Sequence, residues 1–191
     1  AISPFSGPRN RYPKSCKIFK FDWVALWSHI LTFIAGINNI SLLDANSTFV
    51  TPLSLSTLTQ SKTYENIFEK NSETDIDHIS LSRWADLIIV LPTTANFMSK
   101  LSIGKAEDLA TTVILASNKD ILLIPAMNVR MWLHKATQSN LKILQDFGYL
   151  FLGPEKGEMA CGEFGEGKMS SPRQIYSYLK NYFNQRNIVN K

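Results

Sequence analysis

Cysteine is scarce in this chain. Its 191 residues contain two, Cys16 and Cys161, in settings so different that they do not suggest a disulfide framework. This usage fits a reducing compartment, and we expect the chain in the cytoplasm. No spacing typical of metal ligands occurs around Cys161, and we expect no bound metal.

The sequence also lacks an apolar run long enough to span a bilayer. The one candidate, residues 24–37, has about 14 residues and includes His29, whereas a transmembrane helix needs about 20. No small-residue cleavage site follows it, which argues against a signal peptide. We therefore predict a buried helix or strand there and no membrane partner.

After about residue 20, the sequence has no segment in which charge of one sign is concentrated. The chain has 20 Lys and Arg against 16 Asp and Glu, a net charge of +4, and much of the excess precedes residue 21. No later basic run is interleaved with aromatic residues, so we expect a solvated surface and no nucleic acid partner. The length and the absence of repeats or low-complexity linkers favour one domain over residues 1–191.

Short apolar runs alternate with helical patterns from about residue 48 onward. Residues 87–91 and 121–124 are runs that proline ends, and residues 149–152 suit a third strand. The helical stretches are residues 96–106, 108–116, 137–147 and 172–186, the last with a Ser-Pro-Arg-Gln start that is typical of a capped helix. The alternation predicts a Rossmann-like three-layer α/β/α fold with a parallel sheet.

Three segments follow the predicted strands, where open α/β sheets bind ligands. Residues 92–96 carry hydroxyls and an amide before a helix, which serve either an anionic ligand or simple capping. In residues 125–132, Asn128 has methionine and tryptophan neighbours, which suit either a carboxylate site or ordinary core. Residues 153–169 are glycine-rich and predict a mobile flap, on which Cys161 is either inert or positioned to transfer a proton.

One histidine also stands near these segments. His78 precedes the first of the three predicted strands and is either a surface or core residue or an acid–base group that works near neutral pH.

Four segments together resemble a known family. Residues 77–86 read DHISLSRWAD, residues 92–96 PTTAN, residues 125–132 PAMNVRMW and residues 157–169 GEMACGEFGEGKM. In this order they resemble the flavin-containing cysteine decarboxylases, particularly the bacterial phosphopantothenoylcysteine decarboxylases, over about residues 48–172. The combination is far more specific than any one short motif.

The resemblance implies an FMN-dependent carboxy-lyase that converts 4′-phosphopantothenoylcysteine to 4′-phosphopantetheine in coenzyme A synthesis. It implies a homotrimer, or an assembly of trimers, with FMN between subunits. Many bacterial members carry a fused ligase domain, for which the residues after the last predicted helix leave no room, so we expect a phosphopantothenate–cysteine ligase on a separate protein. The implied catalytic residues are His78 as acid or base and Cys161 as proton donor. The implied substrate contacts are Asn128, which would hold the carboxylate, Met131 and Ala126. The implied FMN contacts are Thr51, Thr93, Thr94, Ala95, Asn96 and Phe97, of which Thr93 and Phe97 depart from the family motif.

Residues 1–45 depart from the family pattern. Members normally begin with a strand and a glycine-rich turn that helps to hold the flavin phosphate, and that turn is not recognisable here. Three alternatives stand beside the implied activity. The missing turn favours one of them, an inactive binding or regulatory module. The others are a related peptidyl-cysteine decarboxylase and a flavin prenyltransferase, which would not need the Cys161 segment.

Overall fold

The sheet organises the described part of the chain. The computed structural model describes residues 32–36, 39–43, 53, 57, 63–64, 77–159 and 162–189. Its strands are β1 (Thr32–Gly36), β2 (Asn39–Leu43), β3 (Thr63–Tyr64), β4 (Ile88–Thr93), β5 (Ile121–Pro125) and β6 (Leu150–Phe151), with β7 (Glu155–Glu158) and β8 (Phe164–Lys168) in a separate hairpin. The helices are α2 (Asp77–Trp84), α3 (Ala95–Ser102), α4 (Leu109–Ala116), α5 (Val129–Leu133), α6 (Lys135–Asp146) and α7 (Pro172–Val189).

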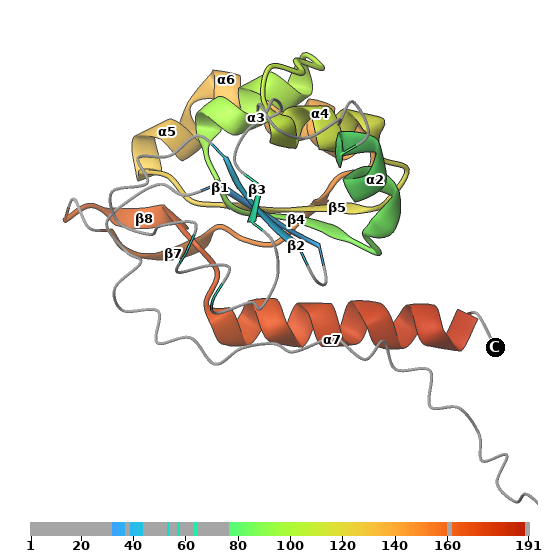
Figure 1. Cartoon of the computed structure of the whole chain (residues 1–191). Coiled ribbons are helices and arrows are strands. Elements are labelled where there is room, and N and C mark those ends of the chain that lie inside the picture. Colours follow the sequence, from blue (N-terminus) through green and yellow to red (C-terminus); the bar gives the residue numbers. More distant parts are fainter. Residues whose placement is uncertain are drawn as a thin grey trace, which may run out of the picture.

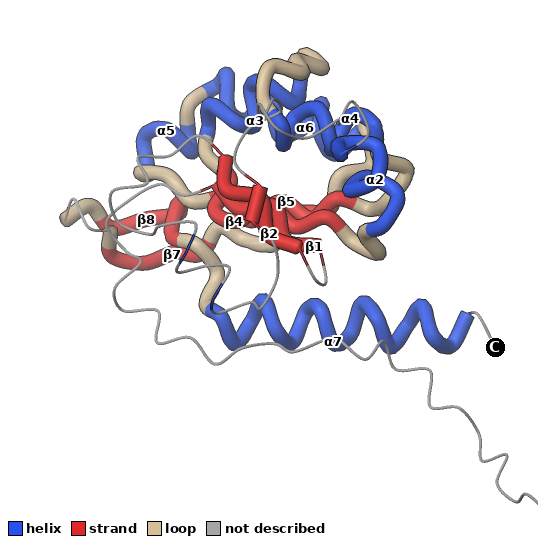
Figure 2. Tube along the Cα trace, in the orientation of Figure 1, coloured by secondary structure: helices blue, strands red, loops and turns tan. Residues whose placement is uncertain are grey.

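Helices cover both faces of the main sheet, which has the order β3-β2-β1-β4-β5-β6. Figures 1 and 2 show α2 to α6 on one side of the sheet and the long α7 on the other. The predicted three-layer α/β/α architecture is confirmed. The predicted parallel pairing holds for β4, β5 and β6, whereas β1 runs antiparallel to both of its neighbours, β2 and β4.

Two apolar cores lie on opposite faces of the central strands. Ile88, Val90, Ile121 and Leu123 pack with the α3–α6 layer, and their alternating neighbours Leu87, Leu122 and Ile124 pack with α7. Because successive side chains of a strand point to opposite faces, a strand covered on both sides must be apolar at nearly every position. This is why continuous runs, rather than alternating ones, mark β4 and β5.

The predicted helices are present, with ends set by local hydrogen bonds. Asp108 and Thr111 form a reciprocal capping box that begins α4, and Gln174 accepts a hydrogen bond from the Ser171 backbone N–H at the start of α7. The helix predicted to extend to residue 106 ends at Ser102, and Gly104 follows with a positive φ of 66°. Lys100 then pairs with Glu107 at 2.6 Å across the connecting loop.

Three further features bear on the predictions. Of the candidate segment 24–37, predicted as a helix or strand, residues 32–36 form the strand β1, and the remainder lies outside the described residues. The segment predicted to be a mobile flap contains the β7–β8 hairpin. Residues 129–133, for which no helix was predicted, form the short helix α5. Within the ranges that the structure describes, no helix combines the length and apolarity that crossing a membrane requires.

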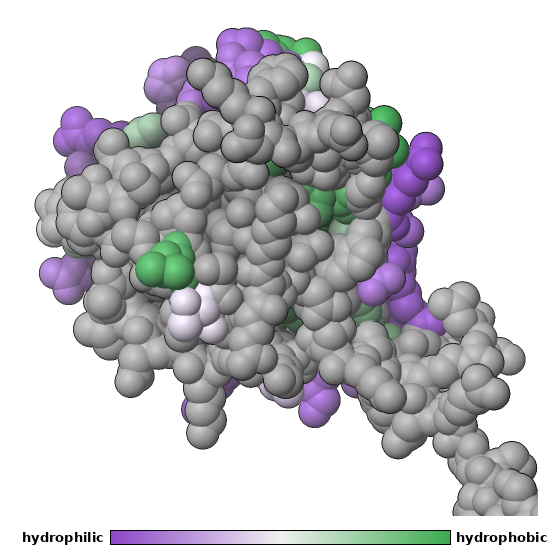
Figure 3. Space-filling model, in the orientation of Figure 1, coloured by the Kyte–Doolittle hydropathy of each residue, from purple (hydrophilic) through white to green (hydrophobic). Residues whose placement is uncertain are grey.

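In the view of Figure 3, the hydrophilic residues that can be seen lie around the rim. The described charged residues are exposed or half-buried, and none of them belongs to either core.

The ends of β4 and β5 are joined by an unusual set of hydrogen bonds. Pro92 was predicted to end its strand, but β4 continues to Thr93, with a shift of register against β5 between Val90 and Thr93. The fully buried Thr93 hydroxyl donates to the Val90 carbonyl at 2.8 Å and accepts from the Ile124 N–H at 3.1 Å. A side chain thus satisfies a backbone N–H that the shifted strand pairing leaves free.

Replacing Thr93 with valine should destabilise the fold by about 1–3 kcal/mol, because the Ile124 N–H would be buried without an acceptor. Urea unfolding would measure the loss. Thr112→Val is the matched control, since that hydroxyl donates only to a helical carbonyl, Asp108 O, and it should cost less than about 0.5 kcal/mol. Equal losses in the two variants would contradict this account of Thr93.

Asp120 anchors α7 to the sheet. It precedes β5, and one of its carboxylate oxygens accepts a hydrogen bond from the Tyr182 hydroxyl at 2.6 Å and one from the Arg186 guanidinium at 2.7 Å. Burial, reinforced by the bond to Asp120, raises the pKa of the Tyr182 phenol well above its usual range. The neutral phenol is therefore the form that the fold stabilises.

Because the folded-state pKa of Tyr182 is raised, its contribution to stability is present below about pH 10 and is lost as the pH rises further. Tyr182→Phe should therefore lose less stability than the parent chain between about pH 9 and about pH 11. Urea unfolding across this range, with the exposed Tyr176→Phe on the same helix as control, tests the point. Identical alkaline losses in the parent chain and Tyr182→Phe would refute it.

Candidate functional site

Two loops meet beyond the carboxyl ends of β4 and β5. Parallel strands bring their carboxyl ends to the same edge of a sheet, and here the Ala126 N–H donates to the Thr93 carbonyl at 3.0 Å. The segment that begins α3 and the segment that begins α5 therefore lie side by side. The Thr94 side chain caps α3 by accepting from the Phe97 N–H at 3.2 Å.

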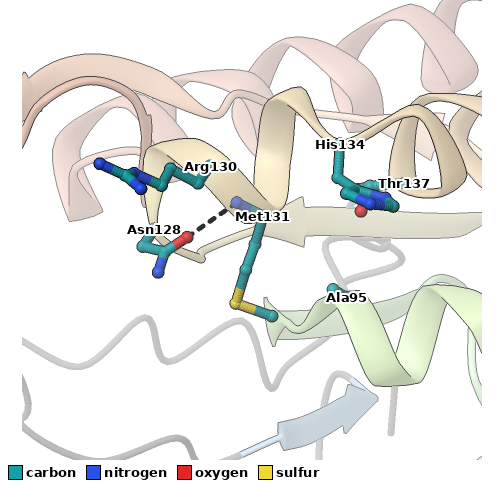
Figure 4. A pocket seen from close by; sticks show the side chains of 6 residues that line it. All are labelled: Ala95, Asn128, Arg130, Met131, His134 and Thr137. Atoms are coloured by element: carbon teal, nitrogen blue, oxygen red, sulfur yellow. Dashed lines mark hydrogen bonds between the residues drawn. The ribbon is translucent and has the colours of Figure 1, made fainter.

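A shallow pocket of about 350 Å³ lies where these segments meet. In Figure 4 the Met131 thioether extends from α5 toward Ala95 at the start of α3, and Arg130 and His134 lie on opposite sides of it. The residues that line the pocket are Ala95, Asn128, Arg130, Met131, His134 and Thr137. The set contains the Arg130 guanidinium, the Asn128 amide and the His134 imidazole but no acidic side chain, so the pocket offers hydrogen-bond donors to an anionic group.

Asn128 has the most informative geometry in the pocket. Its side-chain oxygen accepts a hydrogen bond from the Met131 N–H at 2.7 Å and so caps α5. An amide has two further donors on its nitrogen, and Figure 4 shows this nitrogen turned away from the helix. Capping thus fixes the amide orientation and leaves the exposed nitrogen to donate to a ligand.

His134 caps the next helix in the same way. Its Nδ1 accepts a hydrogen bond from the Ala136 N–H at 3.2 Å, so in the neutral ring the proton is on Nε2. Sequence reasoning missed His134, Arg130 and Thr137 as pocket residues. For His134 the available signal was its position two residues after Trp132, at the boundary between two helices.

The β7–β8 hairpin packs against the segment that carries Asn128. The Met127 N–H donates to the Gly167 carbonyl at 3.0 Å, and a Cβ on Gly165 would lie 2.9 Å from the Val129 methyl groups. Gly167 has a φ of +149°, and a side chain there would collide with the Met127 carbonyl. Both glycines therefore allow a close approach of β8 to this segment.

The predicted ligand contacts fall into two groups. Asn128, Met131 and Ala95 line the pocket, Ala126 and Thr94 are half-buried beside it, and Asn96 is exposed. By contrast, Thr93 is fully buried and bonded within the sheet, and Phe97 is 5% exposed and belongs to the core. Their side chains serve the fold, so we withdraw them as side-chain contacts to FMN.

Three predicted residues cannot be placed at the site. Thr51 and Cys161 lie outside the described residues, and for His78 the structure describes only its position as the second residue of α2. Their roles remain predictions. Among the described residues, no group of three or more His, Cys, Asp or Glu side chains is arranged to hold a metal ion.

Known proteins resemble this chain over most of its length. The Flavoprotein family model matches residues 32–184. The coenzyme A biosynthesis bifunctional protein CoaBC of Haemophilus influenzae is 40% identical over 147 residues, which are 77% of this chain and 37% of that protein. The chain thus spans little more than a third of this relative.

Two solved structures share the fold. A PPC decarboxylase variant in complex with pantothenoylaminoethenethiol is 29% identical, with a TM-score of 0.66 over 75% of this chain and 81% of that one. The FMN-dependent cysteine decarboxylase SpaF is 26% identical, with a TM-score of 0.58 over 69% and 71% of the two chains.

The geometry of Asn128 predicts that its two roles can be separated. Asn128→Asp keeps a capping oxygen and should change the free energy of unfolding by less than about 0.5 kcal/mol, whereas Asn128→Ala should cost about 1 kcal/mol. Urea unfolding of both variants measures the difference. If Asn128→Asp lost as much unfolding free energy as Asn128→Ala, the side-chain oxygen would not stabilise the protein by capping α5.

Proposed function

This chain belongs to the flavoprotein family, and we propose that it is an FMN-dependent decarboxylase of 4′-phosphopantothenoylcysteine that produces 4′-phosphopantetheine for coenzyme A. The observation that carries the proposal is Asn128, a pocket-lining residue whose oxygen is held by α5 while its amide nitrogen is turned away from the helix. A carboxylate is the complementary ligand, because it accepts two hydrogen bonds.

The chemistry of the substrate calls for a cofactor. A cysteine-derived carboxylate has no group that can take up the electron pair released as CO₂ departs. Bound FMN supplies this chemistry by accepting two electrons from the substrate thiol and returning them after decarboxylation, so that the net reaction is redox-neutral. The protein has to hold the carboxylate, position the thiol carbon and exclude water.

The residues at the edge of the sheet fit a flavin. Thr94 and Ala95 are half-buried and Asn96 is exposed at the start of α3. They supply small side chains and an amide at a helix start, where backbone N–H groups favour a polar or anionic ligand group. We assign the FMN contacts to these three residues, together with Thr51. Met131 lines the pocket and the half-buried Ala126 lies beside it, and we assign both to contacts with the substrate.

Two proton-handling roles complete the proposal. His78 acts as acid or base when the thiol is oxidised, and Cys161 gives a proton to the enethiolate that remains after CO₂ is lost. Neither role rests on a described side chain. Each rests on the family motifs in which these residues stand.

The choice of substrate follows the degree of similarity. The chain is 40% identical to the coenzyme A biosynthesis protein of Haemophilus influenzae. Among solved structures, the PPC decarboxylase variant is 29% identical with a TM-score of 0.66, against 26% and 0.58 for SpaF. These matches support the small-molecule substrate of coenzyme A synthesis over the peptidyl-cysteine alternative. In the cell we place the protein in the cytoplasm, as a homotrimer or an assembly of trimers, with a phosphopantothenate–cysteine ligase activity that supplies the substrate.

The purified chain should turn yellow with FMN and keep the colour through gel filtration at the mass of a trimer. The visible absorbance spectrum of the eluted protein is the measurement. Colourless protein at saturating FMN would instead favour the inactive binding module, in keeping with the unusual residues 1–45.

Asn128→Asp should lower kcat/KM for 4′-phosphopantothenoylcysteine by about 10- to 100-fold or more, because it replaces donors with a negative charge that faces the substrate carboxylate. Its FMN absorbance and stability should match those of the parent chain. Full activity in this variant would rule out Asn128 as the carboxylate site.

Cys161→Ser should release the oxidised enethiol product rather than 4′-phosphopantetheine, because the proton donor for the second half of the reaction is lost. Mass spectrometry of the products distinguishes the two compounds, which differ by two hydrogen atoms. Normal 4′-phosphopantetheine production would remove Cys161 from the mechanism.

A further inference from the structure

Alternate residues of the segment 163–167, which includes most of β8, face residues 127–130, which form the Asn128 loop and the start of α5. Gly167 bonds to Met127, Gly165 packs on Val129, and Glu163, just before β8, pairs with Arg130. The spacing of two residues is that of one face of a strand. The segment therefore lies along the loop as a strip, with contacts at both ends.

The two ends of this strip are held differently. At the Gly167 end, β8 is held by the backbone hydrogen bond from the Met127 N–H to the Gly167 carbonyl. This close approach is possible because Gly167 has no side chain. At the other end, next to the β7–β8 turn, the contact is the ion pair between Arg130 Nε and Glu163 Oε1 at 3.3 Å. The second carboxylate oxygen of Glu163 is buried and has no hydrogen-bond partner among the described residues.

Glu163 also closes the turn through its backbone. Its carbonyl accepts a hydrogen bond from the Met159 N–H at 2.9 Å, and the Met159 carbonyl accepts one from the Gly162 N–H at 2.9 Å. The position of Glu163 is thus coupled to both described sides of the turn. Arg130 lines the pocket and lies two residues after Asn128.

We propose that Arg130 and Glu163 are a positioning pair that holds the turn of the β7–β8 hairpin beside the carboxylate site. The pair acts on the reaction through Asn128 and the turn, not by touching the reacting atoms. This role deepens the proposed decarboxylation and rests on it. The Arg130 side chain is 88% accessible. The stabilisation of the turn by the ion pair is therefore modest, and salt weakens it.

Amide hydrogen exchange tests the physical part without requiring activity. In Arg130→Glu, exchange at Met159 and Gly162 should rise by about two- to five-fold, the range expected for a partly exposed ion pair. The Met127 amide should keep its rate, because its bond to Gly167 is at the other end. The charge swap Arg130→Glu with Glu163→Arg should restore the parent rates, and ionic strength of about 0.5 M should reduce the difference.

Lys135→Glu is the matched control, because it makes the same charge change at an exposed position of the neighbouring helix α6. It should leave all of these rates unchanged. Unchanged rates in Arg130→Glu, equal acceleration at Met127, or a swap that fails to restore the turn would each overturn the proposal.

Turnover with 4′-phosphopantothenoylcysteine tests the functional part. Arg130→Glu should raise KM several-fold, with a smaller change in kcat, and the swap should recover most of the loss, which a purely structural role would not require. Parent-level KM in Arg130→Glu would overturn the positioning role. A parent chain that binds FMN but releases no CO₂ would instead refute the proposed function, and the exchange result would still decide whether the pair holds the turn.

Discussion

The junction at Thr93 is the constraint on which the site depends. The pairing of β4 with β5 shifts between Val90 and Thr93, so the Thr93 hydroxyl accepts the hydrogen bond from the Ile124 N–H. The Thr93 carbonyl accepts one from the Ala126 N–H. These bonds fix where both strands end. The start of α3 and the start of α5 are placed relative to each other as a consequence, and the pocket lies between them.

From this junction outward, short-range polar contacts orient the chemistry. Thr94, Asn128 and His134 each cap a helix with one side-chain atom, and Asn128 and His134 each carry a second polar side-chain atom beside it. Capping is favourable by about 1 kcal/mol for a typical residue, so it holds these groups in place before any ligand binds. The glycines of β8 then allow the hairpin to approach the same loop closely. The donors of the pocket are therefore arranged in advance for an anion.

Much of this arrangement could be predicted from the sequence, and the reasons are specific. The apolar runs of β4 and β5 and the capping residues of α7 are local signals, and they located these elements to within a few residues. The antiparallel pairing of β1 and the five-residue helix α5 depend on tertiary partners, which no local pattern reveals. Motif matching included Thr93 and Phe97 because it records residue type and not burial. It missed Arg130 and His134 because their position in the pocket depends on how α5 and α6 pack.

The central claim is that this edge of the sheet supports a redox-neutral decarboxylation. Its most direct test is a turnover experiment with FMN-loaded chain and carboxyl-labelled 4′-phosphopantothenoylcysteine under strictly anaerobic conditions, in which labelled CO₂ and 4′-phosphopantetheine are both quantified. The account predicts equal amounts of the two products over many turnovers with no added oxidant or reductant. Release of no CO₂ by FMN-loaded protein, or release that stops after one turnover unless oxygen is admitted, would contradict it.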